Sequence, residues 1–206
     1  MSELRVALTF DTEHPDRPSD PGTTGALLGL LAARDIRATF FIQGRWAEAH
    51  PATAAAIAAA GHQVGSHSHY HARMPLLTDA GLAADLADAT AAIADATSMD
   101  PRPWFRCPFG VGADDPRVLA AVGSAGYRHV GWHVSAEDWD PKHDALYVET
   151  AIVDGVLRHG DGAVVLLHAW PTAMLEALDP IVTRLADAGA RFVRIDALDD
   201  PPVGVA

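Results

Sequence analysis

Three histidines within five residues form a dense group of potential metal ligands in the segment GSHSHYH: His67, His69 and His71. Imidazole is a common ligand of transition metals, so two of these side chains could bind one ion. In a helical turn, His67 and His71 would share a face as an i, i+4 pair. In an extended strand they would stand about 13 Å apart, and only neighbours two residues apart could chelate. A polar surface loop without a ligand is the alternative interpretation.

Two carboxylates lie two residues apart in the segment LTFDTEH, where Asp11 and Glu13 follow an apolar run. A catalytic zinc site typically has three protein ligands and an open position for water. Two histidines and one carboxylate would make such a triad, and the other carboxylate would accept a proton. An acidic turn without a catalytic role is the alternative.

An arginine lies among aromatic residues in the segment WFRCPFG, which contains Arg106 and Phe109. A guanidinium in this turn could hold a nearby carboxylate ionised and oriented. The backbone N–H of Phe109 could face a developing oxyanion, because Pro108 and Gly110 restrict the turn. An arginine that caps a loop is the alternative. Cys107 lacks an evident base, so we predict a structural role for it.

A further histidine, His168, ends the apolar run VVLLH, and Asp138 and Trp139 follow another strand-like run. A histidine in this context is often buried and structural, but its place at the end of a strand favours a general acid. Asp138 could pair with His168 or with Arg106 and set its protonation, and Trp139 could line the wall of a pocket.

Short apolar runs that alternate with Ala- and Leu-rich stretches must position these residues. We predict strands at residues 5–10, 38–42, 63–65, 104–106, 127–134, 163–167 and 191–195. The clearest helix spans residues 78–96, with Thr78 as the expected N-cap. Its apolar stripe comprises Leu82, Leu86, Ala89 and Ile93. Further helices are expected after Gly22, Pro51, Pro116, Ala145 and Thr172.

Seven strands that alternate with helices imply a parallel α/β sheet, either a barrel or an open doubly wound sheet. In both architectures, functional residues collect at the carboxyl ends of the strands. Asp11, the histidine cluster, Arg106 and His168 all fall at or just past these ends. We therefore expect them to form one site.

The composition limits the class of protein. The chain has 206 residues, 49% of them hydrophobic, which suits one compact domain. Its formal charge of −12 argues against nucleic acid or an anionic membrane as a partner. No apolar stretch approaches the roughly 20 residues of a membrane helix. The first residues lack the basic and apolar regions of a signal peptide, which predicts a cytoplasmic location.

Five motifs in order carry a resemblance to a known family. They are Thr9-Phe10-Asp11-Thr12-Glu13, His67-Ser68-His69-Tyr70-His71, Arg106-Cys107-Pro108-Phe109-Gly110, Asp138-Trp139 and Leu166-Leu167-His168. Together they resemble the polysaccharide deacetylases with the NodB homology domain, carbohydrate esterase family four. Each motif alone is weak, but five in order over about residues 5–195 are specific.

The resemblance implies an α/β fold, a distorted (β/α)7-type barrel with parallel strands, in a single domain. We place this domain at residues 1–198 and a C-terminal tail at 199–206. The resemblance also implies one divalent metal ion, usually zinc, with cobalt or manganese as alternatives. The implied activity is the removal of an N-acyl group, usually acetyl, from an amino sugar, an oligosaccharide or a related amide.

Residue roles also follow from the resemblance. His67 and His71 would be metal ligands, and Asp11 the general base that activates water. His168 would be the general acid that protonates the leaving amine. Arg106 would orient Asp11, and Asp138 would set the protonation of His168. The substrate pocket would comprise Phe109, Trp139 and Leu166.

Thr12 departs from the pattern of the family, because the second aspartate of the first motif normally binds the metal. We predict that Glu13 takes this place as the third ligand, with Asp11 as the competitor. His69 would be a bystander or would donate a hydrogen bond to a ligand. If neither carboxylate binds, the chain would be a metal-free or inactive family member, acting on a small cyclic amide or as a carbohydrate-binding protein.

Overall fold

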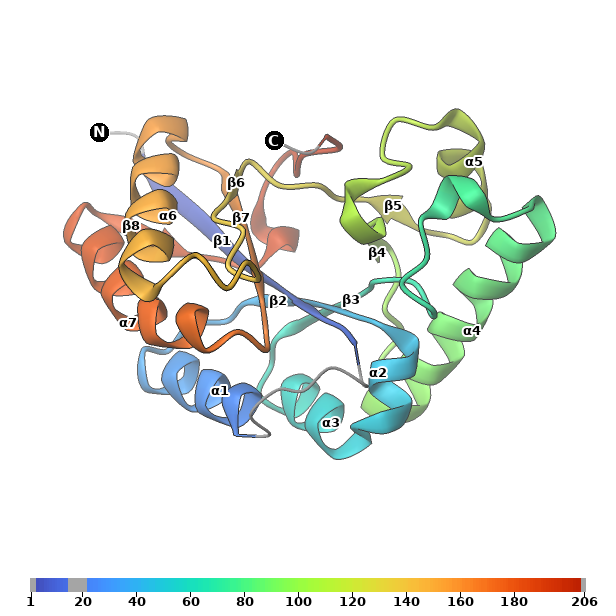
Figure 1. Ribbon diagram of the computed structural model, residues 1–206, viewed down its shortest axis with the longest axis horizontal. Coiled ribbons are helices and arrows are strands. Elements are labelled where there is room, and N and C mark those ends of the chain that lie inside the picture. Colours follow the sequence, from blue (N-terminus) through green and yellow to red (C-terminus); the bar gives the residue numbers. More distant parts are fainter. Residues whose placement is uncertain (1–2, 15–21, 205–206) are drawn as a thin grey trace.

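A single parallel sheet forms the centre of the molecule (Figure 1). The computed structural model describes residues 3–14 and 22–204. The strands are β1 (Leu4–Thr12), β2 (Thr39–Ile42), β3 (Gln63–Ser66), β4 (Trp104–Phe105), β5 (Arg128–His129), β6 (Val134–Ser135), β7 (Ala163–His168) and β8 (Ala190–Phe192). Every pairing among them is parallel, in the order β5-β4-β3-β2-β1-β7-β6, with β8 beside the start of β1.

Helices surround the curved sheet on its outside (Figure 1). They are α1 (Thr23–Ala33), α2 (Gly44–Ala49), α3 (Pro51–Ala59), α4 (Asp79–Thr97), α5 (Pro116–Ser124), α6 (Ala145–His159) and α7 (Thr172–Asp187). Three short 3₁₀ segments follow strands: η1 (Met74–Leu76) after β3, η2 (Pro108–Gly110) after β4 and η3 (Ile195–Ala197) after β8. The predicted α/β fold with a distorted, barrel-like parallel sheet is confirmed.

Alternation along β1 separates the core from the site. Val6, Leu8 and Phe10 are fully buried in the main core, which lies between the sheet and the helices. Ala7 belongs to a smaller apolar cluster inside the curve of the sheet. Because side chains alternate across a strand, Asp11 shares the inner face with Ala7. The apolar inner cluster therefore ends where the polar side chains begin.

The predicted strand at residues 127–134 was wrong as a single element. The structure has two short strands there, because β5 pairs with β4 whereas β6 pairs with β7. Between them the chain crosses the gap in the sheet, and the Arg106 guanidinium donates to the carbonyls of Val130 and Gly131. Gly131 N–H donates to the carbonyl of Pro202. An arginine and the C-terminal segment therefore satisfy backbone groups that a continuous sheet would have paired.

Other element boundaries agree with the prediction or differ locally. Thr78 caps α4, since its side chain accepts a hydrogen bond from Gly81 N–H at 3.1 Å. The last predicted strand, 191–195, ends early at Phe192, and Ile195 begins η3. The short helix α2 was not predicted. No helix in the described ranges is long and apolar enough to cross a membrane. The division into 1–198 and 199–206 stays a prediction, and the outermost residues of both segments lie outside the described residues.

Candidate active site

The register of the sheet brings the strand ends to one level. Thr12 pairs with Ile42, Ile42 with Ser66, and Ser66 with Phe105. Asp11 pairs with His168 on the other side of β1. The residues that follow these positions therefore surround one space at the carboxyl edge of the sheet.

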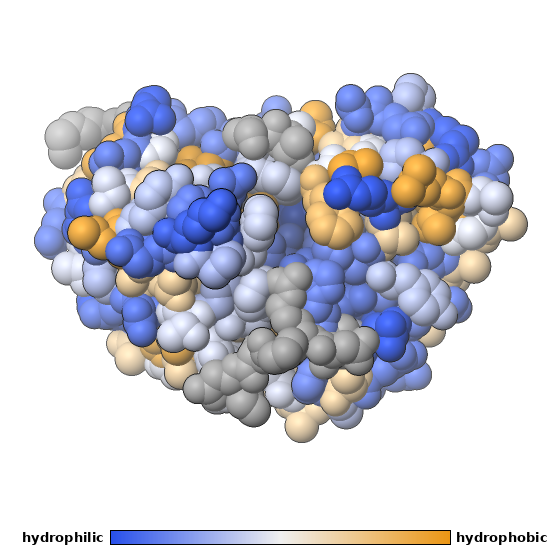
Figure 2. Space-filling model, viewed as in Figure 1, coloured by the Kyte–Doolittle hydropathy of each residue, from blue (hydrophilic) through white to orange (hydrophobic). Residues whose placement is uncertain are grey.

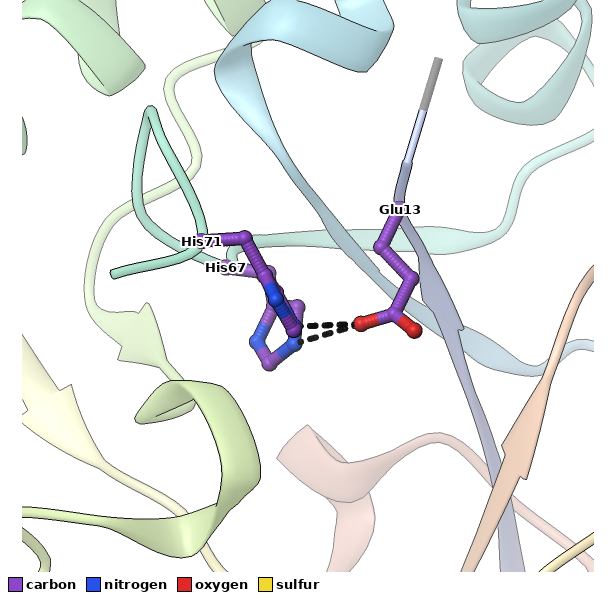
Figure 3. Close-up of side chains that lie close together, drawn as sticks. All are labelled: Glu13, His67 and His71. Atoms are coloured by element: carbon purple, nitrogen blue, oxygen red, sulfur yellow. Dashed lines mark ion pairs between the residues drawn. The ribbon is translucent and has the colours of Figure 1, made fainter. Parts of the chain in front are cut away.

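Glu13, His67 and His71 point toward one another at this edge (Figure 3). One potential ligand atom from each lies within 4.8 Å of the other two, and all three side chains are buried. Oε2 of Glu13 lies 3.5 Å from Nε2 of His67 and in direct contact with Nε2 of His71. One carboxylate and two imidazoles in this arrangement are able to bind a metal ion.

The histidine segment turns without forming a helix, contrary to the condition we set for pairing His67 with His71. Ser68 and His71 adopt left-handed backbone angles, with φ of 62° and 57°. The Oγ atom of Ser68 accepts a hydrogen bond from His71 N–H at 2.9 Å. This tight loop brings the two rings to 4.9 Å between centroids. An irregular loop thus achieves what we expected only of a helical turn.

The hydrogen-bonding state of the two histidines fits a divalent metal. Nδ1 of His67 lies 3.0 Å from the carbonyl oxygen of Arg106, which can only accept, so Nδ1 carries a proton. In the neutral ring this leaves the Nε2 lone pair directed at Glu13. Nδ1 of His71 makes no hydrogen bond with a described residue, and its Nε2 contacts Glu13. Burial lowers the pKa of His71 despite the opposing effect of Glu13, which favours the neutral form that ligands need.

Glu13 is held as a carboxylate. Burial alone would raise its pKa, but contacts with His14, His67 and His71 outweigh burial and hold the pKa well below its usual range. Nε2 of His14 lies 3.2 Å from Oε1 of Glu13. His14 therefore occupies the carboxylate oxygen that does not contact His71, and it leaves Oε2 for the shared site.

Asp11 lies beside this cluster, paired with the fully buried Arg106. NH1 of Arg106 donates to Oδ1 of Asp11 and to Oγ1 of Thr9, both at 2.9 Å. The guanidinium also stacks on the Phe41 ring, 4.0 Å from its centroid. Oδ2 of Asp11 lies 3.4 Å from Nε2 of His67. The arginine thus neutralises and orients one oxygen, and the other oxygen faces the cluster.

His168 and Asp138 form a second buried pair. Nδ1 of His168 lies 2.7 Å from Oδ1 of Asp138, and the backbone N–H of His168 donates to Oδ2 at 2.8 Å. Nε2 lies 3.9 Å from Oε1 of Glu13. Burial lowers the pKa of His168, but the charge and hydrogen bond of Asp138, with smaller contributions from Glu13 and Asp11, raise it to about 9. The imidazole is therefore protonated at neutral pH.

A cleft of about 1150 Å³ opens above these groups. A hollow is visible between the half of the molecule with α6 and the half with α5 (Figure 2). The predicted pocket residues Phe109, Trp139 and Leu166 all line the cleft. Leu166 is buried, whereas Phe109 and Trp139 are about half exposed, at 52% and 48%. The cleft therefore has an apolar floor beside the charged groups and aromatic side chains at its rim.

Three motif residues do not contribute to the cluster. Thr12 is fully buried, and its hydroxyl donates toward the Phe41 carbonyl, so it does not face the histidines. The ring of His69 packs against Tyr70, with 4.5 Å between centroids. Cys107 is buried, and burial raises the pKa of its thiol to about 12, which makes it a poor nucleophile.

Sequence reasoning assigned no role to three residues around the site: His14, Thr9 and Asp85. His14 and Thr9 flank residues that we had singled out and carry no separate signal. Asp85 does carry one, because it lies in the apolar stripe of α4 between Leu82 and Leu86 and is 3% exposed. A carboxylate within a buried helical stripe is unusual and could have been noted.

Comparison with protein families agrees with the fold and the motifs. A family model described as polysaccharide deacetylase matches residues 1–130. The chain therefore belongs to the polysaccharide deacetylase family, with a NodB homology domain, which is carbohydrate esterase family four.

Individual relatives differ in length and in activity. The chain is 30% identical over 194 residues to the peptidoglycan-N-acetylglucosamine deacetylase PgdA of Listeria monocytogenes, covering 94% of this chain but only 38% of that protein. It is 33% identical to a chitooligosaccharide deacetylase of Sinorhizobium fredii, over 79% of this chain and 71% of the relative. A solved structure of BA3943, a family pseudoenzyme from Bacillus anthracis, matches with a TM-score of 0.83 at 27% identity, covering 96% and 66% of the two chains.

Proposed function

We propose that this protein is a metal-dependent N-deacetylase that acts on an N-acetylated amino sugar or oligosaccharide. The observation that carries the proposal is the cluster of Glu13, His67 and His71 between two charged pairs, Asp11 with Arg106 and His168 with Asp138. Hydrolysis of an amide is assisted by a Lewis acid, a base and an acid around one carbon atom. The three clustered side chains would hold the Lewis acid, and the two charged pairs contain the base and the acid.

Glu13, His67 and His71 would hold the metal, with zinc the first candidate because of the mixed nitrogen and oxygen donors. The metal, when bound, supplies Lewis-acid chemistry: it polarises the amide carbonyl and lowers the pKa of water. Burial of all three side chains strengthens this electrostatic effect, since the local dielectric is low.

Asp11 acts as the general base in this proposal. Its Oδ2 atom faces the cluster, while Arg106 engages Oδ1 and fixes the orientation of the carboxylate. Asp11 takes a proton from the attacking water, and the new C–O bond forms at the amide carbon. General-base catalysis of this kind typically contributes 10² to 10⁴-fold in rate.

His168 acts as the general acid. Asp138 accepts from Nδ1, so the proton on Nε2 faces the cleft. His168 gives this proton to the leaving nitrogen as the C–N bond breaks, and the products are a free amine and a carboxylate. Leu166 beside it would contact the methyl group of an acetyl substrate, with Trp139 at the rim of the same cleft.

The substrate class rests on the names of the relatives. One is named as a deacetylase of peptidoglycan N-acetylglucosamine and one as a deacetylase of chitooligosaccharides, so both names point to N-acetylated glycans. We propose the same class here. The half-exposed aromatic rings of Phe109 and Trp139 support it, because sugar rings pack well on aromatic side chains that are apolar yet accessible.

The decisive experiment measures acetate release from N-acetylglucosamine oligomers by protein purified without a histidine tag. The protein is stripped with a chelator and then reconstituted separately with Zn²⁺, Co²⁺ or Mn²⁺. We expect no activity after stripping and recovery with at least one metal. Stoichiometric metal binding without acetate release from any oligomer or small N-acetyl amide would contradict the proposal.

A second candidate is a catalytically inactive, carbohydrate-binding member of the family. It is favoured by the likeness to the pseudoenzyme BA3943, of which a mutant with restored activity is also known, and by Thr12 in place of the metal-binding aspartate. This candidate predicts glycan binding without acetate release and no metal in the purified protein. The retained charged pairs around the cluster argue against it.

A further inference from the structure

The loop that carries His71 has its backbone groups bound on two sides. Its carbonyl groups face α2: Gly44 N–H donates to the Ser68 carbonyl at 2.9 Å, and Arg45 N–H to the His69 carbonyl at 3.3 Å. Its N–H groups face α4, where one side chain, Asp85, accepts two of them. The loop is thus held between the first turn of α2 and the second turn of α4.

Asp85 binds two successive N–H groups with its two oxygens. Oδ1 accepts from His69 N–H and Oδ2 from Tyr70 N–H, each at 3.0 Å. The third N–H, that of His71, donates to Oγ of Ser68. Asp85 therefore holds the two residues that directly precede His71, and Ser68 holds the backbone of His71 itself.

The position of Asp85 is costly for folding alone. It lies in the apolar stripe of α4, and burial raises its pKa while the two backbone N–H groups act against that shift. An apolar residue would suit the stripe better, because a buried carboxylate loses its hydration. The loop needs an external partner, since Ser68 and His71 adopt left-handed angles that non-glycine residues rarely take.

We infer that Asp85 is a positioning residue for the metal site, which holds the 68–71 loop so that His71 faces Glu13 and His67. The inference rests on the proposed metal-dependent function. Groups that orient a metal ligand typically influence metal affinity by 10-fold to 100-fold when they are removed. Asp85 touches neither substrate nor metal, so its effect should fall on metal affinity and not on the chemical step.

The test measures the affinity of the purified protein for Zn²⁺ and Co²⁺ by competition with a chelator. Asp85→Asn should raise the metal Kd by roughly 10-fold to 100-fold, and the absorption spectrum of bound Co²⁺ should change. At saturating metal, acetate release should return close to the wild-type rate. Asp88→Asn is the matched control, because it removes one charge from the exposed side of the same helix, and its Kd should equal that of wild type.

An unchanged Kd in folded Asp85→Asn overturns the inference. If this variant does not fold, amide exchange of the metal-free wild-type protein decides: slow exchange at His69 and Tyr70 supports the inference, and fast exchange at both overturns it. Failure of the proposed function gives a different result, since the wild-type protein would then bind no metal or release no acetate.

Discussion

The carboxyl end of β1 and the 67–71 loop contribute side chains to the same cluster, but different interactions determine where those side chains lie. Glu13 follows a regular strand, and its direction is set by the alternation of side chains from Ala7 onward. His71 lies in an irregular loop with two left-handed residues, fixed by side chains of other elements. Strand alternation therefore places Glu13, whereas the place of His71 depends on contacts from distant residues.

This difference explains how a chain with Thr12 in the first motif can keep a carboxylate at the site. The side chains of residues 11 and 13 point to the same face of the sheet. Thr12 points to the opposite face, where it is fully buried. Moving the carboxylate by two positions preserves its side of the sheet, but moving it by one would not. The longer side chain of Glu13 then reaches the histidines.

The largest expected effects come from substitutions of Glu13 and Asp11, which should act on different properties of the protein. Glu13→Gln should abolish both metal binding and acetate release, because it removes the anionic ligand and its contact with His71. Asp11→Asn should retain metal but lose at least about 10³-fold in kcat, because it removes the general base. Metal content by elemental analysis and kcat by acetate release test both expectations.

Thr12→Val is the control for this pair, since it keeps the volume of a side chain that faces away from the cluster; it should bind metal like wild type. Loss of metal in Asp11→Asn, together with retention in Glu13→Gln, would show that the two carboxylates have exchanged roles. Loss in Thr12→Val would contradict the assignment of Thr12 to the opposite face.

The strand side of this comparison could be predicted from sequence, and the loop side could not. The apolar runs located β1, β3 and β7, and with them the level at which Asp11, His67 and His168 lie. The loop could be reached only through resemblance, because neither helical nor extended spacing describes residues 68–71. Asp85 lies in a helix that was predicted correctly, but periodicity does not reveal which neighbour a buried carboxylate binds.

The split of residues 127–134 has a similar cause. Their composition is that of one strand, and nothing local indicates that Val130 and Gly131 lose their places in the sheet. The carbonyls of these residues bind Arg106, which is far away in sequence. Such a tertiary contact overrides the local preference for a strand. It cannot be predicted from the pattern of residues within the segment.

The proposed general acid and its partner show the same contrast, since His168 ends a strand and Asp138 lies in a loop. Asp138 raises the pKa of His168 to about 9, so the protonated acid persists below that pH and is lost above it. Asp138→Asn should lower this pKa, move the alkaline limb of kcat/KM to lower pH, and reduce activity at pH 8 by about 10². The pH profile at saturating metal measures both changes.

Asp140→Asn is the control for that experiment, because Asp140 lies in the same loop and caps Lys142 N–H instead. Its profile should match that of wild type. An alkaline limb that stays in place in Asp138→Asn would show that His168 is not the group that titrates there.

A buried histidine outside both regions shows what burial does without carboxylates. His62 is 2% exposed and accepts a hydrogen bond from Ala38 N–H, and burial followed by the charge of Arg37 lowers its pKa to about 4. Its folded pKa lies below the unfolded value of about 6.5, so its stabilising contribution is present above pH 6.5 and is lost as the pH falls toward 4. At pH 5 the loss should be about 2 kcal/mol.

The free energy of unfolding, measured with urea at pH values between 8 and 5, tests this contribution of His62. His62→Asn keeps an acceptor for Ala38 N–H but cannot bind the proton, so its stability should fall less over this range than that of wild type. His50→Asn, at an exposed position, should fall as wild type does. Equal pH dependence in His62→Asn and wild type would contradict the burial argument.

The smallest expected effect comes from a substitution that disturbs only the packing of the 67–71 loop. Gly44 begins α2, and a Cβ atom there would collide with Nδ1 of His69 and come within 3.0 Å of Cα of Ala89. Gly44→Ala should therefore displace the loop and raise the metal Kd by about 10-fold, although Gly44 binds no metal.

Gly29→Ala in α1 is the control: its Cβ would meet nothing within 4 Å, so metal affinity should stay constant. The helix should also gain about 0.5 to 1 kcal/mol in stability. An unchanged Kd in Gly44→Ala would mean that the loop keeps His71 in place despite displacement of His69, and that it is as firmly determined as the end of β1.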